Sequence, residues 1–290
     1  MNDTTADLAA AEQFLLRAGR LLDRRGFEHR FRDGSAAAVF AALLPYRNDD
    51  GGFGNALEPD IRGRSSQPVP LELALGILDR IDRFDPEVVG AGCDWLASVS
   101  TSEGGVPFIL ETVEDGPHAP WWEPTGKAYL NPTAGIAGHL YERGVDHPWL
   151  EPATAFCWKA LERDFDDIGP DDAVSILGFL EHVPDRDRAE AMFERLGKRI
   201  VDKLAALDPQ ASGYVKSPLE YAPNPDRIGR RLFDDATIDA HLDALAGKQQ
   251  EDGGWPITWE PPSAAAVNEW RGFVTFRVLT VLDDYGRLER

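Results

Sequence analysis

Four glutamates occupy matching positions in a pattern that returns along the chain. Each lies seven residues after a glycine that begins a turn, and a Leu or a Trp precedes it. The glutamates are Glu58, Glu111, Glu220 and Glu260, and the glycines are Gly51, Gly104, Gly213 and Gly253. Carboxylates gathered at equivalent points raise one another's pKa and become candidates for acid–base chemistry. Alternatively, each glutamate accepts backbone N–H bonds at the start of the next helix, which is a structural role.

A second carboxylate accompanies the first copy of the pattern. Asp60 follows Glu58 by two residues and has no counterpart in the other copies. Prolines follow Glu58 and Glu260 directly, and a proline fixes the direction in which a loop leaves. We therefore take Glu58, Asp60 and Glu260 as candidate catalytic carboxylates.

Tryptophans stand beside two of the loop carboxylates. The runs Trp121-Trp122-Glu123-Pro124 and Thr258-Trp259-Glu260-Pro261 share a Trp-Glu-Pro core. Aromatic faces stabilise cations, and they also stack on sugar rings beside catalytic carboxylates. The candidate substrate-binding residues are Trp121, Trp122, Glu123, Trp259, Trp270 and the loop histidine His118. The alternatives are ordinary packing for the tryptophans and a surface position for the histidine.

Helical periodicity dominates the elements that would position these residues. Leu71, Ala74, Leu75, Leu78 and Ile81 fall on one helical face, for example. We expect helices over 5–24, 34–46, 71–81, 86–100, 132–143, 149–163, 171–182, 186–206, 235–249 and 263–285. Strand-like alternation is weak throughout. The sequence predicts an all-α protein with a single domain over residues 1–290.

The turn pattern also predicts an array of similar units. Successive first glycines are 53, 109 and 40 residues apart, so one unit is missing or degraded near residue 160. In each unit a helix ends, a glycine turn follows, and a loop carries the glutamate into another helix. Glycine suits such a turn because it tolerates positive φ.

Composition excludes several classes of partner. The chain has 290 residues, 43% of them hydrophobic, and a net charge of −20, which repels nucleic acid and anionic lipid. Cys93 and Cys157 lie in apolar helical stretches and indicate no disulfide framework and no thiolate metal cluster. The first sixteen residues are acidic, unlike a signal peptide, and no apolar run has membrane-spanning length. We expect a cytoplasmic protein with no membrane insertion, no metal and no cofactor.

One segment carries a family resemblance. Leu245, Gln249, Gly253 and Trp255 have the spacing of the glutamine–tryptophan repeat, and residues 47–53 form a degenerate copy. The chain thereby resembles squalene–hopene cyclases and the wider terpenoid cyclase and protein prenyltransferase superfamily. The resemblance implies a single α/α toroid, a barrel of helical hairpins with about ten to twelve helices and Gly-Gly turns between units. It also implies that Gln249 and Trp255 tie helix ends to neighbouring units.

The family's catalytic motifs are only partly present. Class II cyclases protonate their substrate with an Asp-x-Asp-Asp motif, and the nearest match here begins with Leu232 and ends in Asp234-Asp235. If the pair is catalytic, Asp234 corresponds to the protonating acid. An Asp pair entering a helix is also a common N-cap. The zinc ligands of prenyltransferases and of lanthipeptide cyclases have no convincing counterpart.

These observations lead to three functional hypotheses. The first is a cofactor-independent, acid-catalysed enzyme of cyclase or lyase type acting on an isoprenoid or another apolar small molecule. The second is a carbohydrate-active toroid enzyme with paired Glu and Asp residues. The third is a non-catalytic toroid that binds a small molecule or a protein.

Overall fold

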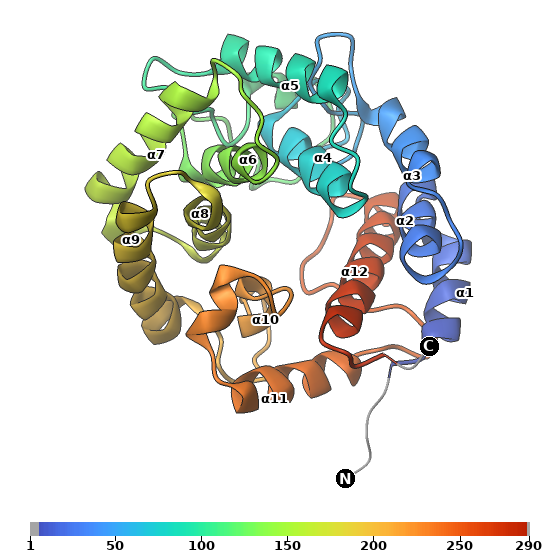
Figure 1. Cartoon of the computed structure of the whole chain (residues 1–290). Coiled ribbons are helices and arrows are strands. Elements are labelled where there is room, and N and C mark those ends of the chain that lie inside the picture. Colours follow the sequence, from blue (N-terminus) through green and yellow to red (C-terminus); the bar gives the residue numbers. More distant parts are fainter. Residues whose placement is uncertain (1–5, 289–290) are drawn as a thin grey trace. The chain divides into compact units, whose positions relative to one another are not determined.

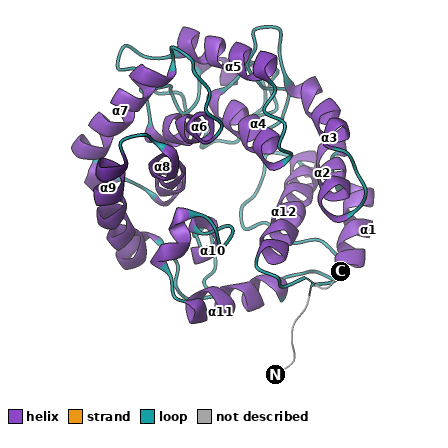
Figure 2. Cartoon of the chain, in the orientation of Figure 1, coloured by secondary structure: helices purple, strands orange, loops and turns teal. Residues whose placement is uncertain are grey.

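The protein is all-helical. The computed structural model describes residues 6–288, and across this range the regular structure consists of twelve α-helices and five short 3₁₀ or π turns (Figure 2). Extended pairing among residues 6–288 is limited to isolated bridges, such as that between Ile61 and His118. The all-α prediction is confirmed.

The chain folds into two compact units. The first comprises Met1–Ala42 and Gly197–Arg290, and the second comprises Leu43–Leu196. The first unit is therefore built from both ends of the sequence, and the second from one continuous stretch. The single domain expected over residues 1–290 stays a prediction.

In the first unit, helices from the two ends of the chain share one core. The helices are α1 (Leu8–Ala18), α2 (Leu21–Phe31), α3 (Ala36–Leu43), α10 (Pro218–Tyr221), α11 (Asp235–Ala246) and α12 (Ala264–Asp284) (Figure 1). Short turns η4 (Ile200–Leu204) and η5 (Ile228–Leu232) lie between them. Helix α12 packs against α1, α2 and α11. Phe14, Phe27 and Leu279 are buried in this core.

The second unit is organised around α6. Its helices are α4 (Pro68–Arg80), α5 (Pro86–Val99), α6 (Leu130–Glu142), α7 (Leu150–Arg163), α8 (Pro170–His182) and α9 (Arg186–Arg199), with turns η1 (Leu44–Tyr46), η2 (Glu111–Asp115) and η3 (Phe165–Asp167). Helix α6 packs against α4, α7 and α8. Gly138 on α6 lies directly against the backbone of Gly178 on α8, since a Cβ added at Gly138 would come within 2.7 Å of it. The absence of a side chain at Gly138 therefore lets these helices approach closely.

Most expected helices are confirmed, with small shifts in their ends. The exception is the range 5–24, whose first residue lies outside the described residues. There the chain forms two helices instead of one, with a break at Gly19 and Arg20. The Asp23 carboxylate accepts hydrogen bonds from the backbone N and Nε of Arg20, at 3.3 and 2.9 Å, and so begins a new helix. The short helix α10 was not predicted.

The glycine turns repeat in space as well as in sequence. Gly51, Gly104, Gly213 and Gly253 have φ values of +92°, +95°, +89° and +91°. A Cβ added at Gly51, Gly104 or Gly253 would lie 2.5, 2.4 or 2.1 Å from the carbonyl oxygen of Ala91, Pro152 or Ala10, respectively. Three of the turns therefore dock in the same way on the helices α5, α7 and α1. Gly213 has open space at this position, so the third copy keeps the turn without the docking.

One property bears on membranes. Among the helices that the structure describes, none combines the length and the apolar character needed to cross a bilayer.

Candidate functional site

A single carboxylate lies among three helices of the second unit. Glu72 stands in the second turn of α4, between the core residues Leu71 and Ala74. Its Oε1 occupies the space beside Gly135 of α6, where an added Cβ would come within 1.7 Å of it. The hydroxyl of Ser175 on α8 donates a long hydrogen bond of 3.4 Å to the same oxygen. The site exists because residue 135 has no side chain.

The surroundings of Glu72 change its proton affinity. Burial disfavours the carboxylate ion and raises the pKa of Glu72 to about 8, against a small opposing effect of the Ser175 hydrogen bond. Most Glu72 side chains are therefore protonated at neutral pH. The residue as a whole is partly exposed, whereas its carboxyl is enclosed by α6 and α8. A protonated carboxylic acid is a candidate general acid.

A second carboxylate fixes the two helices that enclose Glu72. Asp172 accepts hydrogen bonds from the backbone N–H of Gly169, at 3.0 Å, and from that of Asn131. It therefore joins the start of α8 to the start of α6. Burial raises the pKa of Asp172, and the two backbone hydrogen bonds oppose that shift.

The loops that lead into α4 and α6 are joined to each other. Gln67, fully buried before α4, accepts a hydrogen bond from the Leu110 N–H at 2.8 Å and donates one to Thr112 Oγ1 at 2.9 Å. The N–H of Ala119 donates to the Asp60 carbonyl at 2.9 Å. The two loops thus hold the N-terminal ends of both helices.

Four of the sequence-predicted residues meet in these joined loops. Glu58 and Asp60 are almost completely buried, with 4% and 2% of their surface exposed. Trp122 is also buried, and its ring stacks on Phe108 with centroids 5.0 Å apart. His118 Nδ1 lies 2.9 Å from the carbonyl oxygen of Gly116, within the same loop. Two further predicted residues, Trp121 and Glu123, lie on the surface of this region.

The predicted tryptophans of the first unit form a separate aromatic group. Trp259 and Trp270 pack edge to face with centroids 4.9 Å apart. Trp259 also meets Tyr214, and Trp270 meets Phe273. Glu260, the next residue after Trp259, is exposed.

The Asp pair has the geometry of a helix cap. Asp234 is the N-cap of α11, and its Oδ1 accepts a hydrogen bond of 2.7 Å from the Thr237 N–H. Hydrogen bonds from Thr237 lower the pKa of Asp234, whereas a protonating acid needs a raised pKa. Asp235 is exposed and pairs with Arg230. The capping interpretation explains these contacts, and the acid hypothesis finds no support in them.

The four repeat glutamates do not share one role. Glu220 accepts a hydrogen bond of 2.9 Å from the Ser217 N–H at the start of α10, as a structural brace does. Glu58 is buried, whereas Glu111 and Glu260 are exposed. These glutamates occupy equivalent sequence positions but differ in burial.

Gln249 and Trp255 have structural contacts. The Gln249 side chain accepts a hydrogen bond from the Asp7 N–H at 2.7 Å and donates to the carbonyl oxygens of Asp7 and Gly253 at 2.8 and 2.9 Å. Trp255 Nε1 donates to the Leu245 carbonyl at 2.8 Å. Gln249 thus ties the glycine turn to the start of α1.

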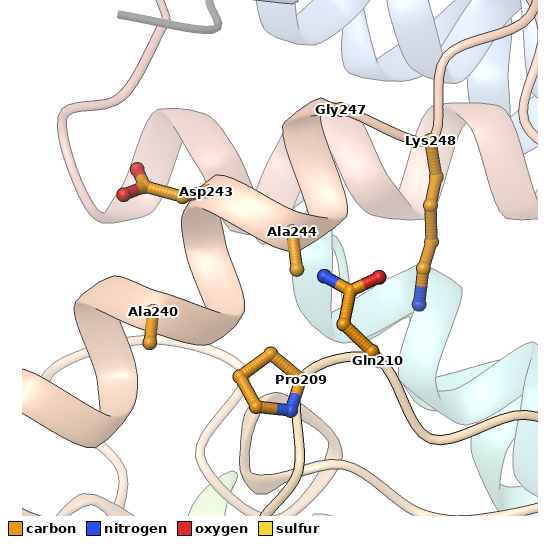
Figure 3. A pocket seen from close by; sticks show the side chains of 7 residues that line it. All are labelled: Pro209, Gln210, Ala240, Asp243, Ala244, Gly247 and Lys248. Atoms are coloured by element: carbon orange, nitrogen blue, oxygen red, sulfur yellow. The ribbon is translucent and has the colours of Figure 1, made fainter. Parts of the chain in front are cut away.

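Two depressions on the protein surface do not include Glu72. One, of about 450 Å³, is in the first unit and is lined by Pro209, Gln210, Ala240, Asp243, Ala244, Gly247 and Lys248 (Figure 3). None of these residues is buried, and Asp243 is paired with Arg287. Another, of about 410 Å³, includes Trp149 and Pro152 in the second unit. Both are shallow, and neither contains a residue that the sequence singled out as catalytic.

Sequence reasoning missed Glu72, although a signal for it was present. Glu72 is the one charged residue between Pro68 and Leu78, a helical stretch that is otherwise apolar. A lone carboxylate in such a stretch is a candidate for burial, and burial raises the pKa of a carboxyl. The repeat pattern drew attention to loop glutamates, and Glu72 belongs to no repeat.

Comparison with known proteins supports the fold alone. No family model matches the chain, and no curated protein matches it. A solved structure described as the crystal structure of a protein from Actinoplanes matches with a TM-score of 0.58 and 18% sequence identity, over 97% of this chain and all of that one. At this identity, the likeness shows a shared all-helical fold and carries no function.

Proposed function

We propose that the protein is an acid-catalysed enzyme acting on an apolar small molecule, with Glu72 as the proton donor. The observation that carries this proposal is the buried carboxyl of Glu72, whose pKa of about 8 keeps it protonated at neutral pH. The expected activity is that of a cyclase or lyase, and it requires no cofactor. Asp234, the donor suggested by the sequence, is not part of the proposed chemistry.

The proposed reaction follows from a neutral carboxylic acid. The O–H bond of Glu72 breaks as a new C–H bond forms on an electron-rich carbon of the substrate, which leaves a carbocation and a carboxylate. The cation then loses a proton to a base, and Glu72 regains its proton from the medium. In the same unit, Phe108 stacks on Trp122 and meets the edge of Tyr129, the residue directly before α6. Such rings stabilise a nearby cation through their quadrupole.

The arrangement of the helices is also part of what we propose. We infer an α/α toroid because three glycine turns dock in one manner on α5, α7 and α1, as units of one array would. The relation to terpenoid cyclases and prenyltransferases rests on Leu245, Gln249, Gly253 and Trp255 and on this repeated docking.

A carbohydrate-active enzyme is the second candidate. The observation that favours it is the aromatic group of the first unit, where Tyr214 is 65% exposed and its ring meets Trp259 beside the exposed Glu260. Exposed rings next to a carboxylate suit a sugar. The paired Glu58 and Asp60 suit it less, because both are buried. If neither candidate holds, a non-catalytic protein that binds a small molecule remains.

Thermal shift against two ligand sets tests the proposal. One set holds prenyl diphosphates and linear terpenes, and the other holds oligosaccharides and uronic acids. A ligand that binds only the folded state raises the melting temperature. We expect a rise with the apolar set, followed by turnover that the Glu72→Gln variant loses and the Asp234→Asn variant keeps. A rise with sugars alone, or equal turnover by Glu72→Gln, would refute the assignment.

A further inference from the structure

A second group of chemically active side chains lies at the opposite end of α4 and α6. Asp79 is in the last turn of α4, and His139 and Glu142 are in the last turn of α6. One ligand atom from each of the three residues lies within 4.8 Å of the other two. All three side chains are partly buried. The group is distinct from Glu72, which precedes Asp79 by seven residues, or about 10 Å along the helix.

We propose that Asp79, His139 and Glu142 bind one divalent transition-metal ion, with zinc as the best match. An imidazole nitrogen combined with two carboxylate oxygens is a ligand set that Zn²⁺ accepts, with bonds of about 2.0–2.2 Å. Hard cations such as Mg²⁺ and Ca²⁺ favour oxygen ligands alone, so the histidine selects against them. Ligand atoms up to 4.8 Å apart can close around an ion through small side-chain rotations.

Arg143 holds one carboxylate of the proposed site in place. Its Nε donates to Asp79 Oδ1 at 2.5 Å, and its Nη1 donates to Asp82 Oδ1 at 2.6 Å. Each carboxylate oxygen has more than one lone pair, so a carboxylate that binds an arginine can also coordinate a metal. Outer hydrogen bonds of this kind orient metal-binding carboxylates and are typical of real sites. Counting Asp79, Asp82 and Glu142 against Arg143, the cluster keeps an excess of negative charge.

Helix α8 adds a further nitrogen beside the cluster. His182 Nε2 lies 3.4 Å from Glu142 Oε2, so a second imidazole contacts one of the proposed ligands. On α4, Gly76 faces His139, whose Nε2 would lie 3.5 Å from a Cβ added there. With three ligands from the protein, a four-coordinate ion has one position left for water or another ligand.

The chain offers a matched control for this proposal. His147 Nε2 lies 3.2 Å from Asp94 Oδ1 on the surface of the same unit. This pair has the same chemistry as a His–carboxylate contact of the cluster. The proposal therefore predicts that substitution of His139 weakens metal binding, whereas substitution of His147 leaves it unchanged.

The test uses the full chain after treatment with a chelator. Zn²⁺ is titrated by calorimetry, and Co²⁺ is titrated by its visible absorption, into the wild type and the His139→Gln, Glu142→Gln and His147→Gln variants. Far-ultraviolet circular dichroism checks that each variant is folded. We expect one ion per chain for the wild type and for His147→Gln, and binding at least about 10-fold weaker for the other two.

Two results would overturn the proposal. One is the absence of stoichiometric Zn²⁺ or Co²⁺ binding by the wild type. The other is unchanged affinity in folded His139→Gln and Glu142→Gln, which would place the ion elsewhere. If either variant does not fold, Co²⁺-induced shifts of the His139 ring signals in the NMR spectrum of the wild type decide between the same two outcomes. The result is independent of Glu72, so failure here leaves the proposed acid catalysis standing.

Discussion

Glu72 and Asp234 are both helix carboxylates, and their surroundings move their pKa values in opposite directions. Glu72 lies inside the second unit against Gly135, where burial raises its pKa to about 8. Asp234 is exposed at the start of α11, where hydrogen bonds from Thr237 lower its pKa. The first is neutral at pH 7, and the second is an anion. At pH 7, therefore, Glu72 can donate a proton and Asp234 cannot.

This difference shows why a motif is a weak guide to an acid. The Asp pair resembles part of a cyclase motif, but its position at a helix N-terminus stabilises the charged form. Glu72 matches no motif, but its position among three helices stabilises the neutral form. Substitutions at Glu72 and Asp234, and at the residues they contact, test whether the surroundings determine these protonation states.

The largest expected effect is on the pH dependence of stability in Glu72→Gln. In the wild type, the pKa of Glu72 rises on folding from its ordinary value of 4.5 to about 8. The folded state therefore holds a proton that the unfolded state releases, and stability falls as pH rises from 4.5 to 8. Gln carries no such proton. Urea unfolding at pH 5 and pH 9 should show that the variant gains a few kcal/mol relative to the wild type at the higher pH.

The other carboxylates contribute to both proteins and cancel in this comparison. A difference between variant and wild type that is the same at pH 5 and pH 9 would show that Glu72 ionises normally, and the contrast with Asp234 would disappear.

The next largest effect is expected for Gly135→Ala. The new Cβ would lie 1.7 Å from Glu72 Oε1, so the carboxyl must leave its place. Overpacking of this kind costs about 1–3 kcal/mol of unfolding free energy. Gly178→Ala on α8 is the matched control, because its Cβ would meet nothing within 4 Å and Ala favours a helix.

Chemical denaturation of both glycine variants gives the comparison. Adding Glu72→Ala to Gly135→Ala should remove most of the loss, because the clash then has no partner. If the loss of unfolding free energy in the double variant equals the sum of the losses in Gly135→Ala and Glu72→Ala, Glu72 does not fill the space beside Gly135.

A smaller effect is expected at the cap of α11. Asp234→Ala removes the hydrogen bond to the Thr237 N–H and should lower the melting temperature by a few degrees, whereas Asp234→Asn should keep most of it. Because the folded pKa of Asp234 is lowered, its contribution is present above its unfolded pKa and is lost as pH falls through the folded value. Melting curves at pH 7 and pH 3 test this, and an equal loss at both pH values would contradict the capping role.

The smallest effect is expected for Ser175→Ala. The Ser175 hydroxyl donates a long hydrogen bond to Glu72 and opposes the effect of burial on its pKa. Without it, the pKa of Glu72 should rise further, and the pH dependence of unfolding measures this change. A lower pKa in this variant would mean that Ser175 stabilises the neutral acid.

The helices were predictable because their periodicity is local. Leu71, Leu75 and Leu78 predicted the buried face of α4, and the glycine turns with positive φ followed from Gly51 and its repeats. The break at Arg20 depends on one side-chain cap from Asp23, which periodicity does not reveal.

The candidate site was less predictable because it depends on contacts between distant segments. Burial raises the pKa of Glu72, and its neighbours Gly135 and Ser175 lie 63 and 103 residues further along the chain. The predicted loop carboxylates Glu58 and Asp60 do lie together, but they are buried among joined loops. The repeat pattern identified glutamates at equivalent sequence positions. The pKa of a carboxylate, however, depends on the residues that it contacts in the folded protein.

The most direct test is an NMR titration of the Glu72 side-chain carboxyl carbon, assigned by its disappearance in Glu72→Gln. If the surroundings of Glu72 make it the acid, its chemical shift will change with a midpoint near pH 8, well above the ordinary value of 4.5. A midpoint close to 4.5 would mean that Glu72 is an anion at neutral pH, and the proposed proton donor would be refuted.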